Sequence, residues 1–262
     1  MKRVFFADSY EQVFADNGLK TFDDIYNCDD GQQINKNTKR NVSVLRLKTK
    51  AGEKKFFLKR LHDSHFKDML FVFMNTGKIA SQAAYEWGNI SRLAKLGVGA
   101  PTLACYGEQL LLGIERKSFI ITQELDGQCL TDFVAQNWAM MPQFEKEKIT
   151  ISLAKNIRKI HDAQISLPDL YVWHIFISPN ENNDYNFAFI DLNRMKRYMW
   201  NRGEKIENLG RLLHSMRDNY FDKPLRKLLI ETYTGGHKTE EFIHGAEHFE
   251  KKYSARRRVP QY

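Results

Sequence analysis

Two stretches decide the fold, LPDLYVWH at residues 167–174 and IDLNR at residues 190–194. Between them, two alternating apolar runs flank a polar loop, and this pattern predicts an antiparallel β-hairpin. If Ile177 pairs near Tyr185, Asp191 extends past the end of the second strand, next to the start of the first. The two stretches are then expected at the same end of one hairpin.

This register sets His174 near Ala188 and gathers Asp169, His174 and Asp191 at that end. Two carboxylates and an imidazole in one place suit a hard-cation site beside a general base. The alternative is that each residue has only a structural role. Asp169 would then cap a turn, Asp191 would end a strand, and His174 would be a core histidine with satisfied hydrogen bonds.

A second informative element is the helix predicted over Lys78–Leu96, which stops at Gly97. Glu86 falls on the apolar line of this helix, and a core-facing carboxylate is costly unless a cation meets it. Lys59, at the end of an apolar strand, is the candidate cation; alternatively, Glu86 lies at the edge of the stripe and reaches water. The apolar line consists of Ile79, Ala83, Ile90 and Leu93.

The coarse pattern predicts an α+β protein of two lobes. Residues 1–125 are expected to be strand-rich around one helix, and residues 126–262 mostly helical with the hairpin, with a junction at 125–127. No element is assigned to residues 1–40, which are polar and mixed. The expected strands of the first lobe are Val42–Leu47, Lys55–Lys59, Leu103–Cys105, Gln109–Ile114 and Ser118–Gln123. In the second lobe Phe144–Ile160 is amphipathic, and a helical stripe steps through Ile206, Leu209, Leu213, Met216 and Tyr220.

Composition excludes several classes of protein. Apolar residues make up 42% of the 262, which rules out wholesale disorder, and no apolar run approaches the ~20 residues that span a bilayer. No signal peptide is indicated. The cysteines at 28, 105 and 129 form no C-x-x-C pair, which argues against a paired-cysteine zinc site and fits a reducing cytoplasm. A net charge of +8 favours an anionic partner, although many proteins are basic without such a role.

The order of these parts is that of protein-kinase-like phosphotransferases: a strand-end Lys, a Glu on a buried helix face, a junction, D-x-x-x-x-H, a hairpin and then an Asp. The chain resembles the lipopolysaccharide core kinases of Gram-negative bacteria, which are heptose and Kdo kinases. The resemblance covers about residues 40 to 197. Its segments are Phe56–His62, Ala84–Trp87, Leu96–Val98, Lys117–Leu125, Pro168–Tyr171, His174–Phe176 and Ile190–Arg194.

The resemblance implies how the first lobe would bind ATP. Lys59 would hold the α- and β-phosphates and would be positioned by an ion pair with Glu86. The carbonyl of Gln123 and the amide of Leu125 would face adenine, with Thr122 at the back of the pocket.

The resemblance also implies the roles of the second lobe. Asp169 would orient and deprotonate the acceptor hydroxyl. Asp191 would hold Mg²⁺, and His174 stands where protein kinases carry a metal-binding Asn. Such groups act by positioning and by neutralising charge, which is most of what phosphoryl transfer requires.

Three departures from the protein-kinase pattern change what is expected. No Gly-rich loop is present, so Lys36, Lys39 or Arg40 would have to cover the phosphates. Leu167-Pro168 precedes Asp169 in place of His-Arg, so control by activation-loop phosphorylation is not expected. Asn193 replaces the Gly of Asp-Phe-Gly, which disfavours large flipping of that segment.

The resemblance implies an inner-core glycolipid as partner, and a cytoplasmic location with peripheral contact at the inner face of the inner membrane. Residues 65–74 are rich in Phe and Met; they are expected to pack in the core, with contact to acyl chains or the membrane as the alternative. Basic side chains are candidates for contact with an anionic leaflet. These are Arg194, Lys196 and Arg197, and a tail with Lys251, Lys252, Arg256, Arg257 and Arg258, whose alternative is a solvated end.

Three other functions compete with a lipopolysaccharide sugar kinase. One is a kinase of the same fold that acts on another small molecule or on protein. Another is a pseudokinase, against which the presence of Lys59, Glu86, Asp169 and Asp191 argues. The third is a nucleic-acid-binding protein, but the chain has no recognisable nucleic-acid-binding motif, and no nucleic-acid partner is expected.

Overall fold

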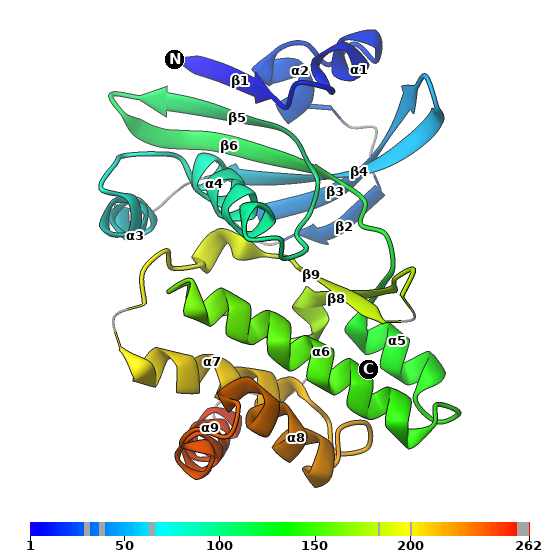
Figure 1. The fold of residues 1–262 in the computed structure, drawn as a ribbon. Coiled ribbons are helices and arrows are strands. Elements are labelled where there is room, and N and C mark those ends of the chain that lie inside the picture. Colours follow the sequence, from blue (N-terminus) through cyan, green and yellow to red (C-terminus); the bar gives the residue numbers. More distant parts are fainter. Residues whose placement is uncertain (29–31, 37–39, 63–65, 183, 200, 256–261) are drawn as a thin grey trace. The chain divides into compact units, whose positions relative to one another are not determined.

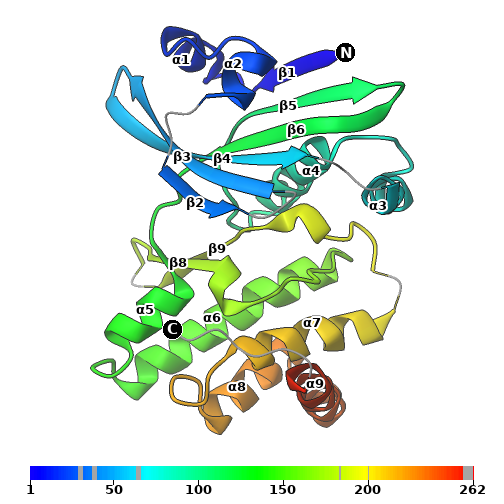
Figure 2. The ribbon, with the colours of Figure 1, turned by 180° about the vertical axis from the view of Figure 1, so that it is seen from behind.

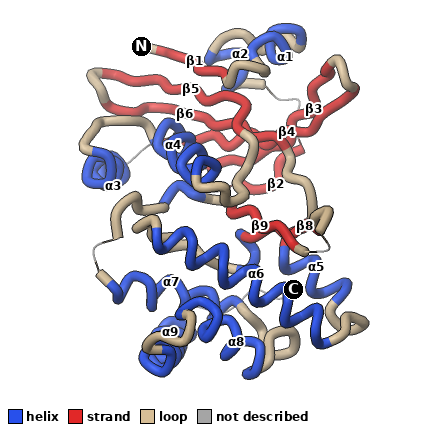
Figure 3. Tube along the Cα trace, in the orientation of Figure 1, coloured by secondary structure: helices blue, strands red, loops and turns tan. Residues whose placement is uncertain are grey.

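The computed structural model describes the chain except for residues 29–31, 37–39, 63–65, 183, 200 and 256–261. The chain divides into two compact units. Unit 1 comprises Met1–Arg92 and Pro101–Leu125, and unit 2 comprises Leu93–Ala100 and Asp126–Tyr262. Unit 1 holds the large sheet and unit 2 most of the helices (Figures 1 and 3), which confirms the predicted α+β class.

In the described residues the sheet of unit 1 has six strands in the order β1-β5-β6-β4-β3-β2, and every neighbouring pair is antiparallel (Figure 2). The predicted hairpin is present as β3–β4, in which Thr49 pairs with Gly52. The strands are β1 Lys2–Phe6, β2 Gln32–Lys36, β3 Arg40–Thr49, β4 Gly52–His62, β5 Leu103–Leu111 and β6 Ile114–Gln123.

Two expectations for β5 and β6 were wrong. The region holds two strands rather than three, and the reversal falls at Leu112 and Gly113, inside the expected strand Gln109–Ile114. Both turn residues have positive φ, 51° and 79°. Leucine is not a typical turn residue, so the apolar run Gln109–Ile114 carries no local signal for the reversal of the chain inside it.

Residues 1–40 contain elements that the sequence analysis did not assign. Strand β1 pairs with β5 at one edge of the sheet. Helices α1 (Glu11–Asp16) and α2 (Phe22–Tyr26) pack on one face, where Phe14, Phe22 and Ile25 enter the core. The available signal was the capping box formed by Thr21 and Asp24 at the start of α2.

The other face of the sheet carries α4 (Gln82–Lys95), which starts later than predicted. Ser81 accepts from the amide of Ala84, as an N-cap residue does, and Ile79 is 67% exposed rather than on the apolar stripe. The end of α4 agrees with the prediction, because Gly97 has φ +63° just after the helix.

Helix α3 (Phe66–Thr76) precedes α4. Packing in the core was expected for this segment, but only one face of the helix is buried. Val72 is buried, and Phe71 packs edge-on against Tyr85 of α4. Leu70, Phe73 and Met74 are exposed. Core packing was therefore the wrong expectation for one face of this helix.

Unit 2 is built around α6 (Gln143–Asp162), whose predicted stripe of Ile149, Leu153, Ile157 and Ile160 is buried. Helix α7 (Arg202–Ser215) ends before Tyr220, so that residue lies outside the predicted helical stripe. The remaining helices are α5 Leu130–Asn137, α8 Lys223–Thr234 and α9 Thr239–Ser254.

A three-stranded sheet of β7 (Gln128–Cys129), β8 (Ile175–Pro179) and β9 (Tyr185–Phe189) lies above these helices in Figure 1. Segment Leu93–Ala100, expected in the first lobe, groups with unit 2 because Gly99 bridges Ala188 and accepts from the amide of Phe189. A Cβ at position 99 would lie 2.3 Å from the carbonyl oxygen of Phe187, so this approach requires glycine.

The register of the β8–β9 hairpin differs from the prediction by two residues. Ile177 pairs with Phe187, and Tyr185 pairs with Pro179. The turn is tighter than expected because the side chain of Asn180 accepts from the amide of Asp184.

Among the helices of the described residues, none combines the length and the apolar character that a membrane crossing requires.

Candidate active site

Lys59 and Glu86 form a buried ion pair in unit 1. Lys59 pairs with Ile120 across β4 and β6, and its side chain leaves the sheet on the face that carries α4. Its Nζ lies 3.0 Å from both Oε1 and Oε2 of Glu86, and the side chains are 15% and 6% exposed. Glu86 is therefore on the core face of its helix, and the cation that the sequence selected meets it.

The end of β6 places Thr122, Gln123 and Leu125 as follows. Thr122 pairs with Phe57, so it shares a sheet face with Lys59 two residues on. The side chain of Gln123 lies on the opposite face of the sheet, where its Oε1 accepts a hydrogen bond from the hydroxyl of Tyr10. The Gln123 side chain is therefore not on the sheet face of Lys59. The amide of Leu125 makes no hydrogen bond within the described part of the chain. The unpaired amide of Leu125, two residues past the end of β6, can donate to an edge nitrogen of a planar heterocycle.

In unit 2 one small cavity is lined by Asp169, His174 and Asp191, together with apolar side chains. The observed register places Ile190 rather than Ala188 opposite His174, and the amide of Ile190 donates to the carbonyl of His174. His174 Nε2 then lies 4.0 Å from Asp191 Oδ2. His174 Nδ1 lies 2.9 Å from the carbonyl oxygen of Asp169.

These contacts define the tautomer of His174. A carbonyl oxygen only accepts, so Nδ1 carries the hydrogen, and in the neutral ring the lone pair of Nε2 is on the side of Asp191. A histidine that donates one N–H to a backbone carbonyl and presents its other nitrogen is arranged as metal-ligating histidines are. His174 is thus neither fully buried nor fully satisfied.

Asp191 has an unusual backbone, with φ 54° and ψ 53° at the end of β9. Left-handed conformations at residues other than glycine cost free energy and concentrate at functional sites. Two residues on, Asn193 is buried, and neither its Oδ1 nor its Nδ2 has a hydrogen-bond partner among the described residues. Both features set the segment after β9 apart from an ordinary strand end.

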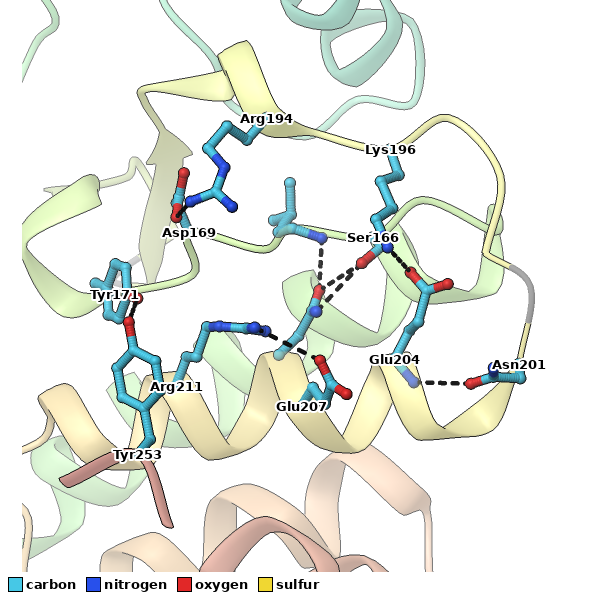
Figure 4. A network of polar contacts seen from close by, with 12 residues as sticks. Ser166, Asp169, Tyr171, Arg194, Lys196, Asn201, Glu204, Glu207, Arg211 and Tyr253 are labelled. Atoms are coloured by element: carbon cyan, nitrogen blue, oxygen red, sulfur yellow. Dashed lines mark hydrogen bonds and ion pairs between the residues drawn. The ribbon is translucent and has the colours of Figure 1, made fainter. Parts of the chain in front are cut away.

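Asp169 is paired with Arg194, a contact that the sequence analysis missed (Figure 4). Arg194 Nη1 lies 3.2 Å from Asp169 Oδ1, and the arginine side chain is 61% exposed. Within the described part of the chain, the carboxylate of Asp169 makes no hydrogen bond to the backbone of its own turn. Arg194 and Lys196 are both candidates for contact with an anionic leaflet, and each pairs with an acid here, Lys196 with Glu204 at 3.1 Å. The IDLNR spacing alone contained no signal for the pair.

The segment that carries Asp169 is held by the side chain of Asn208, on α7, and by the backbone of Lys196. Asn208 Oδ1 accepts from the amide of Leu167 at 2.5 Å, and Asn208 Nδ2 donates to Ser166 Oγ. Ser166 also exchanges both backbone hydrogen bonds with Lys196, at 3.1 and 3.0 Å. The backbone just before Asp169 is therefore fixed on two sides.

His161 extends this network inside unit 2. Its Nδ1 lies 2.8 Å from the hydroxyl of Tyr233, and its Nε2 lies 3.3 Å from Asn208 Oδ1. Desolvation by burial lowers the pKa of His161 to about 3, so the ring is neutral. Its place on the buried stripe, four residues after Ile157, was the signal that sequence analysis overlooked.

The side chains of Asp191 and His174 are of chemical types that suit a Mg²⁺ ion bound to a nucleotide. Among the described residues no group of three His, Cys, Asp or Glu side chains could hold a metal ion alone. Mg²⁺ is commonly bound by one or two carboxylates together with substrate phosphates, and Asp191 supplies one such carboxylate. Imidazole nitrogen suits Mg²⁺ less well than oxygen, so Asp191 is the stronger of the two candidates.

Some candidates for anion contact cannot be placed. Lys39 and the tail residues Arg256–Arg258 lie outside the described residues, and the side chain of Lys36 is likewise not described.

Comparison with known proteins gives consistent results. A sequence model described as the lipopolysaccharide kinase (Kdo/WaaP) family matches residues 30–233, most of the chain. The lipopolysaccharide core heptose(I) kinase WaaP of Escherichia coli K12 is 27% identical over 202 residues, which is 70% of this chain and 76% of that protein. WaaP of Pseudomonas aeruginosa is 27% identical over 166 residues, 56% of this chain and 62% of its own length.

A solved structure, described as WaaP in complex with acyl carrier protein, superposes with a TM-score of 0.72 at 20% identity. The match covers 97% of this chain and 98% of the other. This likeness extends over both units and establishes the fold, which is the predicted two-lobed one.

Proposed function

The chain belongs to the lipopolysaccharide kinase (Kdo/WaaP) family, and from this premise we propose that it phosphorylates a hydroxyl of an inner-core sugar of lipopolysaccharide. Membership makes the chain a kinase, which transfers a phosphoryl group from ATP. The acceptor and the roles of individual residues are our proposal. The observation that carries it is the buried contact of Lys59 with Glu86, in which a carboxylate holds an ammonium on the sheet face that Thr122 shares.

We assign the nucleotide contacts of unit 1 to four residues. Lys59 binds the α- and β-phosphate oxygens while Glu86 keeps its ammonium in place. The carbonyl of Gln123 and the amide of Leu125 bind the adenine edge, and Thr122 closes the back of that pocket. The support is positional, since Lys59 and Thr122 leave the same face of the sheet.

We assign the acceptor chemistry to Asp169 and Arg194. Asp169 orients the sugar hydroxyl and accepts its proton as the oxygen attacks phosphorus. Arg194, which pairs with Asp169 in the chain alone, has further N–H donors for the transferring phosphoryl group. A guanidinium beside the carboxylate also limits repulsion between that carboxylate and an anionic substrate.

Asp191 and His174 would hold Mg²⁺ on the nucleotide, with Asp191 as the main ligand. The metal supplies neutralisation of charge on the phosphates. The left-handed backbone at Asp191 and the Nε2 lone pair of His174 support this assignment.

A heptose is favoured over Kdo as the acceptor sugar, because the curated relatives are heptose(I) kinases. Such an acceptor is part of a lipid-anchored glycan, so we place the chain at the cytoplasmic face of the inner membrane, in peripheral contact with it. One relative has been solved with acyl carrier protein, and a protein of that kind is a candidate partner.

The test is transfer of phosphate by the purified chain to defined core acceptors, read by mass spectrometry. Heptose-terminated and Kdo-terminated acceptors are offered with Mg²⁺ and ATP, and Asp169→Asn serves as the inactive comparison. Wild type should phosphorylate a core sugar and the variant should not. Transfer only to proteins or unrelated sugars would overturn the acceptor class, and nucleotide binding without transfer to any acceptor would indicate a pseudokinase.

A further inference from the structure

Helix α3 has two apolar faces, and only one of them is buried within unit 1. Val72 and Phe71 face inward, toward α4. Leu70, Phe73 and Met74 stand at i, i+3 and i+4 and form a second face that is open to solvent. Solvating three large apolar side chains on one helix face is unfavourable, so this face is suited to an apolar partner.

The turn between β5 and β6 has the same character. Leu112 at its tip is 95% exposed, and Leu111 and Ile114 beside it are also exposed. Leu112 adopts φ 51° and Gly113 φ 79°, the signs of a type I′ turn, where Asn or Asp is favoured at the first position. A leucine at this position is unfavourable in two ways, because its left-handed backbone costs free energy and its apolar side chain is exposed to water. The geometry of the turn therefore does not explain the presence of leucine.

These two segments adjoin. The carboxylate of Glu115, next to Ile114, accepts from the amide of Gln82 at 3.1 Å, and Gln82 is three residues after Ile79. Figures 1 and 2 place α3 and the β5–β6 turn toward the same end of the sheet. We call the seven side chains the apolar patch, and they make up more than half of the exposed large hydrophobic residues in the described chain: Leu70, Phe73, Met74, Ile79, Leu111, Leu112 and Ile114.

Cations border the apolar patch. Lys67, Lys78, Arg116 and Lys117 are exposed in these two segments. Lys117 lies over the ring of Tyr26, and the other three make no ion pair with the described residues. The two acids in these segments are Glu115, which is buried, and Asp68, which is half-buried and has an interaction partner, so four exposed cations outnumber them at the surface. The solvent-facing charge around the patch is therefore positive, which is complementary to anionic lipid head groups.

We propose that the apolar patch is where the chain docks on a lipid bilayer that contains anionic lipids. This deepens the proposed function, on which it rests, because it names the surface that brings the kinase to a lipid-anchored acceptor. A turn tip and a helix face project separately from unit 1. A fluid bilayer accepts side chains at different heights, with Leu112 and Phe73 entering the interface and the cations remaining at head-group level.

The test is flotation of the purified full chain with vesicles of phosphatidylethanolamine alone or with phosphatidylglycerol. Wild type should float with the anionic vesicles. Leu112→Asn and the double variant Phe73→Gln/Met74→Gln should each weaken partitioning by about tenfold or more. Leu112→Asn also creates an Asn-Gly turn, so a folding defect is not expected from it.

The charge arm uses Lys67→Ala and Lys78→Ala, each expected to weaken binding to anionic vesicles by about fivefold. The matched controls are Met140→Gln, an exposed apolar residue of unit 2, and Lys223→Ala, an exposed lysine of unit 2. Both should float like wild type.

The outcomes distinguish a lipid bilayer from an acidic protein as the partner of the apolar patch. They also separate the docking proposal from the proposed function. No flotation of wild type, or equal loss in the controls, would overturn the docking surface. Binding of purified acyl carrier protein without vesicles, lost in the same patch variants while vesicles are ignored, would assign the patch to an acidic protein and overturn the lipid proposal. Phosphate transfer to a water-soluble, deacylated acceptor tests the function separately, and the patch variants should retain it.

Discussion

At the scale of single residues, the Lys59–Glu86 contact depends on a charge as well as a shape. Both side chains are largely withdrawn from water, so neither charge has adequate compensation without the other. Glu86 also lies on α4, and its position is fixed by the packing of that helix. The ammonium is therefore held at one place on the sheet face before any nucleotide arrives.

Glu86→Gln tests this coupling because it keeps the shape and removes the charge. We expect phosphate transfer to fall by about 10- to 100-fold, since misplacement of a phosphate-binding group costs rates of this order. The measurement is kcat/KM for ATP together with the far-ultraviolet circular dichroism spectrum. Glu124→Gln is the control, because Glu124 pairs with Lys55 at a more exposed position. Equal loss in both variants would contradict a specific role for Glu86.

Asp169→Asn removes the proposed base and retains a hydrogen-bonding side chain of the same size. Transfer should fall by about 10²- to 10⁴-fold, the usual contribution of a general base, while nucleotide binding persists. Steady-state transfer and equilibrium nucleotide binding are measured on the same preparation. Asp132→Asn, at an exposed position of α5, should behave as wild type. Transfer at the normal rate by the Asp169 variant would remove the assigned base.

His161 gives a prediction about pH. In the folded chain its pKa is lowered to about 3 by burial, whereas in the unfolded chain it is near 6.5. Between these values the unfolded chain binds a proton that the folded chain does not. The free energy of unfolding should therefore decrease as pH falls below about 6.5, by up to about 1.4 kcal/mol per pH unit from this group. Burial lowers the pKa of His214 as well, which acts in the same direction.

The measurement is denaturant unfolding from about pH 7 to about pH 5, for wild type and for His161→Gln. Glutamine retains a donor and an acceptor but does not titrate, so the variant should show a shallower loss of stability on acidification. Parallel pH profiles for the two proteins would show that His161 does not titrate on unfolding.

At the scale of elements, α7 is the support of the segment that carries Asp169. Asn208→Leu should leave the amide of Leu167 without its partner, at a cost of about 1–3 kcal/mol in stability. If the contact positions Asp169, kcat should fall while KM for ATP changes little. Asn208→Asp, which restores an acceptor for that amide, should recover kcat in part. A variant with lowered stability and normal kcat would reduce Asn208 to a structural role.

The elements also show which patterns the sequence encodes locally. The β3–β4 hairpin and the buried stripe of α6 follow from alternation and from helical spacing, and both were predicted. The start of α4 and the β5–β6 reversal were not, because Ser81 is a single weak cap signal and Leu112 is an atypical turn residue. The β8–β9 register shifted by two residues because a side chain, Asn180, shortened the turn.

At the scale of the whole molecule, the candidate site was predictable where burial of a charged side chain is costly without a partner of opposite charge. Glu86 on an apolar stripe demanded a cation, and Lys59 was available on a strand. Asp169, His174 and Asp191 followed from hairpin connectivity. Arg194 and Asn208 did not, because their contacts depend on the packing of distant segments that no local pattern specifies.

The whole chain also offers a single measurement that involves groups of both units. A ligand at 100 times its dissociation constant stabilises a protein by about 2.7 kcal/mol, which for a chain of this size raises Tm by about 5–10 °C. ATP with Mg²⁺ should produce such a shift in wild type and in Asp169→Asn. Lys59→Ala, in unit 1, and Asp191→Asn, in unit 2, should each lose most of it, since one would lack a phosphate contact and the other the metal carboxylate. A normal shift in Asp191→Asn, with the same Mg²⁺ dependence as wild type, would show that this carboxylate does not hold the metal, and the assignment of unit 2 to metal binding would then fail.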